Sequence, residues 1–218
     1  ARSRILSELP ESFATSIKQT LIDLCVEIKE GTELELIHKS KAYLSSGEKV
    51  AVSDYYLFAV GRSPNTDLDL EKAKIKFDAR GIKINSKLQT TNSRVYAIGD
   101  CIDSYKFTHF ASGQARQFLI EESMLFSKHK MGALPSVIFT DPEVATVGQL
   151  VEDSLVKKFD IDFCDSDKAL IDDEKNSKAA IFVDMFSGEI KGAIVLGNFA
   201  EHIINFFTLA INTKYSLF

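Results

Sequence analysis

The stretch TTNSRVYAIGDC, Thr90 to Cys101, places a glycine and a carboxylate directly after an apolar run. The run Val95 to Ile98 is typical of a buried strand, and Gly99 leaves room for a backbone or a ligand to come close. Asp100 would then lie at the carboxyl end of the strand, where open α/β sheets bind ligands and where a carboxylate can accept hydrogen bonds from sugar or ribitol hydroxyls. An isolated Gly-Asp pair more often caps a turn or a helix, so the neighbouring sequence has to decide.

A long helix is predicted just beyond this stretch, over residues 108–128, because apolar residues recur there on one face. The residues around its start are Lys106, Phe107, Thr108 and His109. The first turn of a helix has positive dipole character and attracts anionic oxygens. If the ligand were a flavin, this helix end could stabilise the charge that collects on the reduced ring. His109 taken alone is also consistent with a partly buried structural histidine.

The motif AVGRSPN, Ala59 to Asn65, repeats the same device of an apolar run that ends at a glycine. Gly61 would let the backbone approach a ligand, and Pro64 would fix the turn. Arg62 could meet a phosphate or a carboxylate of another domain. Taken in isolation, the motif would be a turn with Arg62 in a surface ion pair.

Composition limits the class of protein. The chain has 218 residues, 45% of them apolar, and a net charge of -5, which suits one large or two small globular domains. Its acidic and basic residues are interspersed, so neither nucleic acid nor anionic lipid is an expected partner. Apolar runs are far shorter than the ~20 residues of a membrane helix and the first residues lack an apolar signal core, so a cytoplasmic protein is expected. Cys25, Cys101 and Cys164 form no CxxC or CxxxxC pair, and no metal-ligand spacing is visible among the cysteines and histidines.

The patterns predict a mixed α/β and α+β chain. A first helix is expected from Ser12, with Ser12 as its N-cap and an apolar face of Phe13, Ile17, Leu21 and Leu24. The predicted strands are 26–28, 33–37, 41–44, 49–52, 54–60, 79–86, 95–100, 137–139, 144–148, 161–164, 178–184 and 190–196. The segment 54–60, DYYLFAV, is expected to be a central strand covered on both faces.

Further helical segments are expected at three places. The segment 61–73 is predicted to be turn-rich and then short-helical, and a polar helix-like stretch should follow Gly148. The glycine and proline of MGALPS indicate a domain boundary near Ala133. The last helix carries a broad apolar face that needs a partner, made of Ala200, Ile203, Ile204, Phe207, Ala210 and Ile211.

Five motifs follow one another along the chain: AVGRSPN, RGIKIN, TTNSRVYAIGDC, FTHFASGQA and FTDPEVATVG. In this order and spacing they resemble the pyridine nucleotide-disulfide oxidoreductases, flavoenzymes of the dihydrolipoamide dehydrogenase, glutathione reductase and mercuric reductase kind. The resemblance covers the chain from about Ile5 to its end. The joint match is far more specific than any one motif.

The resemblance implies three segments: 1–58 as the second half of an NAD(P)-binding domain, 59–132 as the carboxyl-side part of an FAD-binding domain, both Rossmann-like, and 133–218 as an α+β dimerisation domain truncated at its C-terminus. Carried over by motif, Asp100 would bind the ribityl chain of FAD, and Lys106, Phe107, Thr108 and His109 would lie along the flavin. Gly61 would touch the nicotinamide cofactor. The motifs FTDPEVA and GAIVLGNFAEHI match the dimerisation domain, which implies a homodimer through residues 133–218.

The chain lacks the family's GxGxxG turns and its CxxxxC redox pair, and the family's HPTxxE-like segment would follow shortly after Leu217. The expectation is a carboxyl-side fragment without catalytic residues of its own, inactive alone and holding neither FAD nor NAD(P)H without the missing amino-terminal half. The parent would move electrons between NAD(P)H, FAD and a redox-active disulfide. Two alternatives stay open: a non-enzymatic dimerisation module, and a fragment of a relative that passes hydride to peroxide or serves an iron–sulfur partner. Cys25 and Lys168 depart from the glycine and arginine common in the family.

Overall fold

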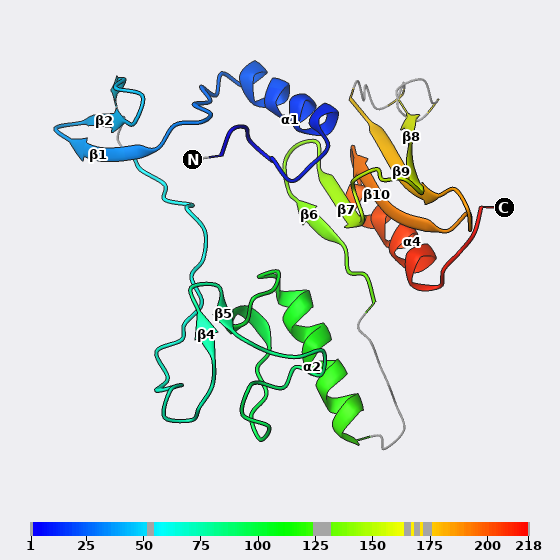
Figure 1. Ribbon diagram of the computed structural model, residues 1–218. Coiled ribbons are helices and arrows are strands. Elements are labelled where there is room, and N and C mark those ends of the chain that lie inside the picture. The colour runs from blue at the N-terminus through cyan, green and yellow to red at the C-terminus, as the bar shows by residue number, and fades with distance from the viewer. Residues whose placement is uncertain are drawn as a thin grey trace. The chain divides into compact units, whose positions relative to one another are not determined.

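The computed structural model describes residues 2–51, 55–123, 132–163, 167, 171 and 176–217. Contacts divide the chain into two units, one of Ala1–Tyr56 with Ala133–Phe218 and the other of Leu57–Gly132 (Figure 1). The first unit therefore joins the beginning of the chain to its end. The three functional segments expected from the resemblance stay predictions, because this division reports only which residues pack together.

A five-stranded antiparallel sheet forms the centre of the first unit, in the order β6-β7-β10-β9-β8. Its strands are β6 (Ser136–Ile138), β7 (Val144–Gly148), β8 (Val156–Asp162), β9 (Lys178–Asp184) and β10 (Ile190–Leu196). The predicted bounds of β7, β9 and β10 are confirmed. The polar stretch after Gly148 has bends and no regular secondary structure before β8 begins, so the expected helix there is wrong. The last strand predicted before β9 is 161–164, and its residue Cys164 lies outside the described residues.

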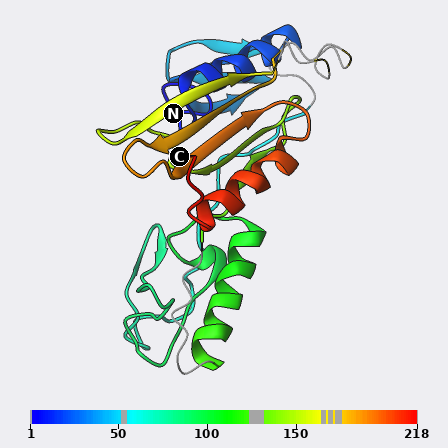
Figure 2. The same ribbon diagram turned by 90° about the vertical axis from the view of Figure 1, so that its right-hand side faces the viewer.

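Each face of this sheet is covered by one helix (Figure 2). Helix α4 (Ala200–Asn212) packs on the face that carries Val147, Ala193 and Val195. Side chains alternate between the faces along a strand, so Ile194 and Leu196 of the same strand point the other way, toward α1. The predicted apolar face of the last helix is confirmed, since its residues Ala200 and Ile204 are fully buried there.

Helix α1 (Glu11–Asp23) buries Phe13 and Ile17 against the opposite face of the sheet, next to Phe182. The helix begins one residue earlier than predicted, with Pro10 rather than Ser12 at the N-cap position. Pro10 is not helical itself, with φ −53° and ψ 140°, but its carbonyl accepts the N–H groups of Phe13 and Ala14 and so begins the helix. The acidic Glu11 then lies in the first turn, where the helix dipole favours it.

The end of α1 explains an odd residue of the sequence. Cys25 has a φ of 61°, in the left-handed region, and its N–H donates to the carbonyl of Ile22 at 2.8 Å. The next N–H, of Val26, donates to the carbonyl of Leu21 at 2.9 Å, which completes a Schellman cap. Leu24 lies at the C-cap and is 67% exposed, so it does not extend the apolar face as predicted.

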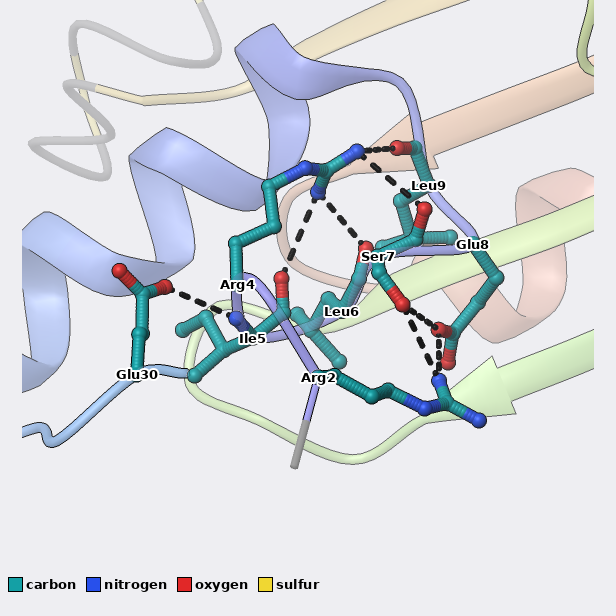
Figure 3. Close-up of polar contacts among 8 residues, drawn as sticks. All are labelled: Arg2, Arg4, Ile5, Leu6, Ser7, Glu8, Leu9 and Glu30. Atoms are coloured by element: carbon teal, nitrogen blue, oxygen red, sulfur yellow. Dashed lines mark hydrogen bonds and ion pairs between the residues drawn. The ribbon is translucent and has the colours of Figure 1, made fainter. Parts of the chain in front are cut away.

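The loop before α1 is held by the guanidinium of Arg4 (Figure 3). It donates to the carbonyl oxygens of Leu6 at 2.9 Å and Leu9 at 2.7 Å. On the other side the carboxylate of Glu30 accepts the N–H of Ile5 at 2.8 Å. These bonds fix the chain where Leu9 enters the core beneath α1.

The predicted strands 33–37, 41–44 and 49–52 are confirmed, with small shifts of their ends, as a three-stranded antiparallel sheet of β1 (Leu34–His38), β2 (Lys41–Leu44) and β3 (Lys49–Ala51). Residues 26–28, expected as a strand, have no regular secondary structure. Their side chains are exposed or half-buried, and within the described residues no strand pairs with them. Their apolar character alone was therefore a weak basis for a strand.

The second unit combines β4 (Phe77–Asp78), β5 (Gly81–Ile82), the 3-10 helix η1 (Gly99–Cys101) and the long helix α2 (Thr108–Ser123). A small core holds it together, formed by Leu70, Ile75, Ile82, Ala97 and Ile102. The start of the long helix is confirmed at residue 108, whereas residues 124–128 of the prediction lie outside the described part.

Two predicted strands and one predicted helix do not form in the segments between residues 55 and 98. Residues 55–60 have no regular secondary structure, with Leu57 93% and Val60 92% exposed, although a buried central strand was expected. The run Val95–Ile98 makes only one bridge, from Tyr96 to Gln89, instead of a strand. Residues 67–74 form successive turns rather than a helix. Apolar composition favours a strand, but a ladder also needs neighbouring strands, and the described residues offer none alongside 55–60 and 95–98.

Candidate functional site

Asp100 lies on a tight turn at the end of the extended run. Ile98 is extended, with φ −137° and ψ 159°, and Gly99 then turns the chain with a φ of 76°, a conformation that side chains rarely adopt. The turn closes when the N–H of Ile102 donates to the carbonyl of Gly99 at 3.2 Å. The carboxylate of Asp100 is 49% exposed, so it remains accessible to a ligand.

The motif AVGRSPN reaches this turn through Arg62. One nitrogen of its guanidinium lies 3.4 Å from the Asp100 carboxylate and donates to the carbonyl of Lys106 at 2.9 Å. Of the partners considered for Arg62, a carboxylate is therefore present, and it belongs to the same unit. The adjacent Gly61 has a φ of 105° and open space around it, so its backbone conformation rather than crowding requires glycine.

Lys106 closes the loop from the other side. Its ammonium group donates to the carbonyl of Asp100 at 2.6 Å and lies 3.4 Å from that of Ile102. The ammonium group of Lys106 therefore binds backbone carbonyl oxygens of the turn, whereas the side chain of Asp100 faces Arg62. Two cationic side chains thus hold the turn. The carboxylate oxygens of Asp100 can still accept hydrogen bonds from further donors.

Aromatic rings gather where α2 begins. The rings of Tyr105, Phe107 and His109 stack in sequence, with centroids 6.3 Å and 5.4 Å apart and planes within 16°. Phe110 lies against all three at 5.1–5.9 Å. The carbonyl of Phe107 accepts the N–H groups of Phe110 and Ala111, so Phe107 caps the helix with its backbone and Thr108 is its first residue. A stack of planar rings beside a helix start is suited to a planar aromatic ligand.

The β4–β5 hairpin supports the loop after Asp100. Gly81 has a φ of 134°, and a Cβ at this position would lie 2.6 Å from the carbonyl oxygen of Cys101. Only a glycine lets the hairpin come this close. Lys83 forms a 2.6 Å ion pair with Asp78, and this bond, followed by the N–H of Arg80, lowers the pKa of the Asp78 carboxyl. Arg80 also pairs with Asp103 of the loop at 3.3 Å.

Gln114 of α2 is a site residue that the sequence did not reveal. It is 4% exposed, its amide oxygen accepts the N–H of Gly99 at 2.7 Å, and its amide nitrogen lies 3.5 Å from the hydroxyl of Ser104. A search for apolar residues at helical spacing does not select a glutamine. The available signal was its spacing, since Gln114 stands one turn beyond Ala111, which lies 3.4 Å from a Cβ placed on Gly99.

The structure thus brings Asp100 and Lys106 into contact, stacks Phe107 on His109, and places Thr108 at the helix start beside them. Gly61 precedes the arginine that reaches Asp100. Among the described residues, no group of three histidine, cysteine or acidic side chains could hold a metal ion. No helix within the described ranges is long and apolar enough to cross a membrane.

Comparison with known families places the chain first in a class and then in a family. Residues 1–115 match the family model described as pyridine nucleotide-disulphide oxidoreductase, and residues 134–217 match the dimerisation domain of the same proteins. Both matches are to one class of protein, the oxidoreductases that these family models describe. The chain belongs to the pyridine nucleotide-disulphide oxidoreductase family, as the motifs indicate.

Relatives at the level of sequence are dihydrolipoyl dehydrogenases. The protein from Geobacillus stearothermophilus is 30% identical over 220 residues, a match that covers 95% of this chain and 47% of the relative. The protein from Bacillus subtilis is 28% identical over 212 residues, covering 89% of this chain and 44% of the relative. The chain therefore spans less than half the length of these two relatives.

Solved structures share the fold. The flavoprotein disulfide reductase RclA from Escherichia coli has a TM-score of 0.85 at 22% identity, covering 99% of this chain and 52% of that one. LpdA from Mycobacterium tuberculosis has a TM-score of 0.87 at 18% identity, covering 99% of this chain and 49% of that one. The fold therefore recurs in proteins of low sequence identity.

Proposed function

We propose that this chain is the carboxyl-side part of an FAD-dependent oxidoreductase that moves electrons between NAD(P)H, FAD and a redox-active disulfide. In this proposal Asp100 binds the ribityl hydroxyls of FAD, and Lys106, Phe107, Thr108 and His109 lie along the flavin ring. The observation that carries it is the half-exposed carboxylate of Asp100 on a turn held next to a ring stack at a helix start. A flavin has a group for each of these parts, because its polyol chain is joined to a planar ring.

The chemistry that FAD supplies is hydride acceptance and transfer. The contribution of these residues is to bind and orient the cofactor. Asp100 would accept hydrogen bonds from hydroxyl groups, and the positive end of α2 would stabilise negative charge on a reduced ring held beside it. Gly61 is proposed to touch the nicotinamide nucleotide, since its positive φ exposes backbone without a side chain. Use of a nicotinamide nucleotide is in keeping with the cytoplasmic location that we propose.

The dimerisation domain matched at residues 134–217 suggests that the protein forms homodimers. We propose that the outward side of α4 lies at the contact between the two copies. Along it, Phe199 is 61% exposed, Phe206 75% and Leu209 63%, at a spacing that lines one side of a helix. Large apolar side chains in one exposed row mark a protein–protein contact.

The test is flavin retention in the 218-residue chain, alone and assembled with the amino-terminal half of the Geobacillus stearothermophilus relative. The chain alone lacks GxGxxG turns and should purify without a flavin absorption band. The assembled protein should hold FAD, and Asp100→Ala should weaken its affinity about tenfold or more, because a lost hydrogen bond to a charged group costs roughly 1.5–3 kcal/mol.

The matched control is Asp67→Ala, which removes another exposed carboxylate from the same unit. It should leave FAD affinity unchanged. Equal affinity of the Asp100→Ala and Asp67→Ala proteins would remove Asp100 from the proposed site. A tightly held, stoichiometric flavin in the chain alone would contradict the proposed dependence on the amino-terminal half.

A non-enzymatic dimerisation module is the second candidate, favoured by the separate match at residues 134–217. Light scattering of the whole chain and of residues 133–218 separates the two. In the whole chain α1 covers one face of the sheet, so removing residues 1–132 exposes the side chains of Phe182 and Leu196. We expect the short piece to aggregate, whereas a stable, discrete dimer would favour the module.

A further inference from the structure

We infer that Gln114 is a positioning residue for the cofactor site: its buried amide fixes the Asp100 turn relative to the first turn of α2. This inference rests on the proposed FAD site. The two halves of that site come from different elements, the carboxylate from η1 and the ring stack from the residues around the start of α2. Gln114 is a side chain of α2 that bonds directly to the backbone of η1.

The contact is short and shielded from water. The amide oxygen of Gln114 accepts the N–H of Gly99 at 2.7 Å, and Gln114 is 4% exposed. Gly99 immediately precedes Asp100, so a shift of this N–H moves the carboxylate with it. The orientation of the amide follows from its partners, because an N–H can only donate to the oxygen, and the nitrogen then faces the hydroxyl of Ser104.

The side chain nearest to Gly99 on this helix face cannot replace Gln114 as an acceptor. Ala111 fills the space beside Gly99, 3.4 Å from a Cβ placed there, and offers only a methyl group. If the glutamine were apolar, the buried N–H of Gly99 would lose its partner, and a buried unpaired donor is costly. The turn would then rotate toward water, and Asp100 would leave the position set by Arg62 and Lys106.

Helix α2 provides a matched control three residues further on. Gln117 is 6% exposed, and its amide nitrogen donates to the carbonyl of Ser86 at 3.1 Å, away from the Asp100 turn. Gln114→Met and Gln117→Met remove equivalent buried amides from one helix face. If both residues only attach α2 to the unit, the two variants behave alike.

The first measurement is amide hydrogen exchange of Gly99 in the complete 218-residue chain, read by NMR. Gln114→Met should speed the exchange about tenfold or more, whereas Gln117→Met should leave it within about twofold of the original chain. Gln114→Glu should restore slow exchange, because a carboxyl group accepts the N–H in either protonation state. This measurement does not depend on flavin. Unchanged protection of Gly99 in Gln114→Met would overturn the inference.

The second measurement is FAD affinity in the protein assembled with the amino-terminal half of the Geobacillus stearothermophilus relative. Gln114→Met should weaken FAD binding about tenfold, with binding restored by Gln114→Glu and retained in Gln117→Met. Equal weakening in the two methionine variants would reduce Gln114 to a structural residue. If the unmodified assembled protein binds no FAD, the proposed function fails, and the exchange measurement alone decides whether Gln114 holds the turn.

Discussion

The packing of α1 on the five-stranded sheet predicts that Phe13→Ala strongly lowers the stability of the protein. Phe13 is fully buried, lies in the same cluster as Val144, Phe182 and Leu196, and has the ammonium group of Lys178 5.1 Å from its ring. Truncating a buried phenylalanine costs about 3–5 kcal/mol, which includes the cavity it leaves. With roughly 2–4 °C per kcal/mol for a chain of this size, the midpoint of thermal unfolding should fall by about 10 °C.

The assay is thermal and urea unfolding followed by far-ultraviolet circular dichroism. Phe186→Ala is the matched control, because it removes the same ring from the same unit at a position that is 92% exposed. It should change the free energy of unfolding by less than about 0.5 kcal/mol. The urea midpoint of Phe13→Ala should fall with an unchanged slope, as expected for a change of stability alone.

The result that refutes this reasoning is a Phe13→Ala protein as stable as Phe186→Ala. Such a result would mean that α1 does not cover the sheet in solution, since no relaxation of a packed core absorbs the loss of a whole ring. It would also remove the reason to expect aggregation of residues 133–218 on their own.

Three further predictions concern the backbone and pH. Cys25→Gly should raise the free energy of unfolding by about 1 kcal/mol, because glycine adopts the left-handed conformation of this cap without strain, and Cys25→Ala should show no such gain in the same urea titration. Gly81→Ala should displace the backbone at Cys101 and shift the NMR signals of the Asp100 loop, whereas unchanged signals would contradict the close approach. Backbone N–H groups of Ser187 and Phe186 lower the pKa of the Asp184 carboxyl, so its contribution to stability is present above the ordinary aspartate range and is lost as the pH falls. The difference in unfolding midpoint between the original chain and Asp184→Asn should therefore shrink between about pH 5 and pH 3, and a constant difference would contradict this role.

The parts of the fold that the sequence predicted well have their partners close in the chain. Strands β9 and β10 are joined by a short connection and pair with each other, with one irregularity between Ile190 and Gly192, so local alternation already defines both of them. Helix α4 follows directly and packs on β10 and β7, and its apolar face is clear from helical spacing alone. The predicted and observed elements agree where the residues that pack together are close in the sequence.

Predictions failed where a pattern lacked its neighbours. The run 55–60 has the composition of a central strand, yet Tyr55 is 90% exposed and no strand lies beside it among the described residues. Ser12 was a plausible helix cap, but the carbonyl of Pro10 begins the helix earlier. Propensity describes what a segment can form, and tertiary contacts decide whether it does so.

The candidate site divides in the same way. Sequence motifs alone singled out Asp100, Gly61 and the residues around the start of α2. They did not single out Gln114, because a glutamine on a helix is usually solvated, and its importance comes from the N–H of Gly99 fifteen positions away. The partner of Arg62 was likewise open until the fold placed Asp100 3.4 Å from it.

The sequence by itself determined the family, the alternation of the sheet strands and the positions where glycine is needed, because these depend on residue type and local spacing. Only the tertiary structure decided that α1, from the beginning of the chain, covers the sheet formed near its end. Burial of apolar surface brings Phe13 and Phe182 together. This driving force is non-directional and does not depend on how far apart the residues are in the sequence. The same holds for the hydrogen bond between Gln114 and Gly99, since a buried donor takes whichever acceptor the packing brings within reach.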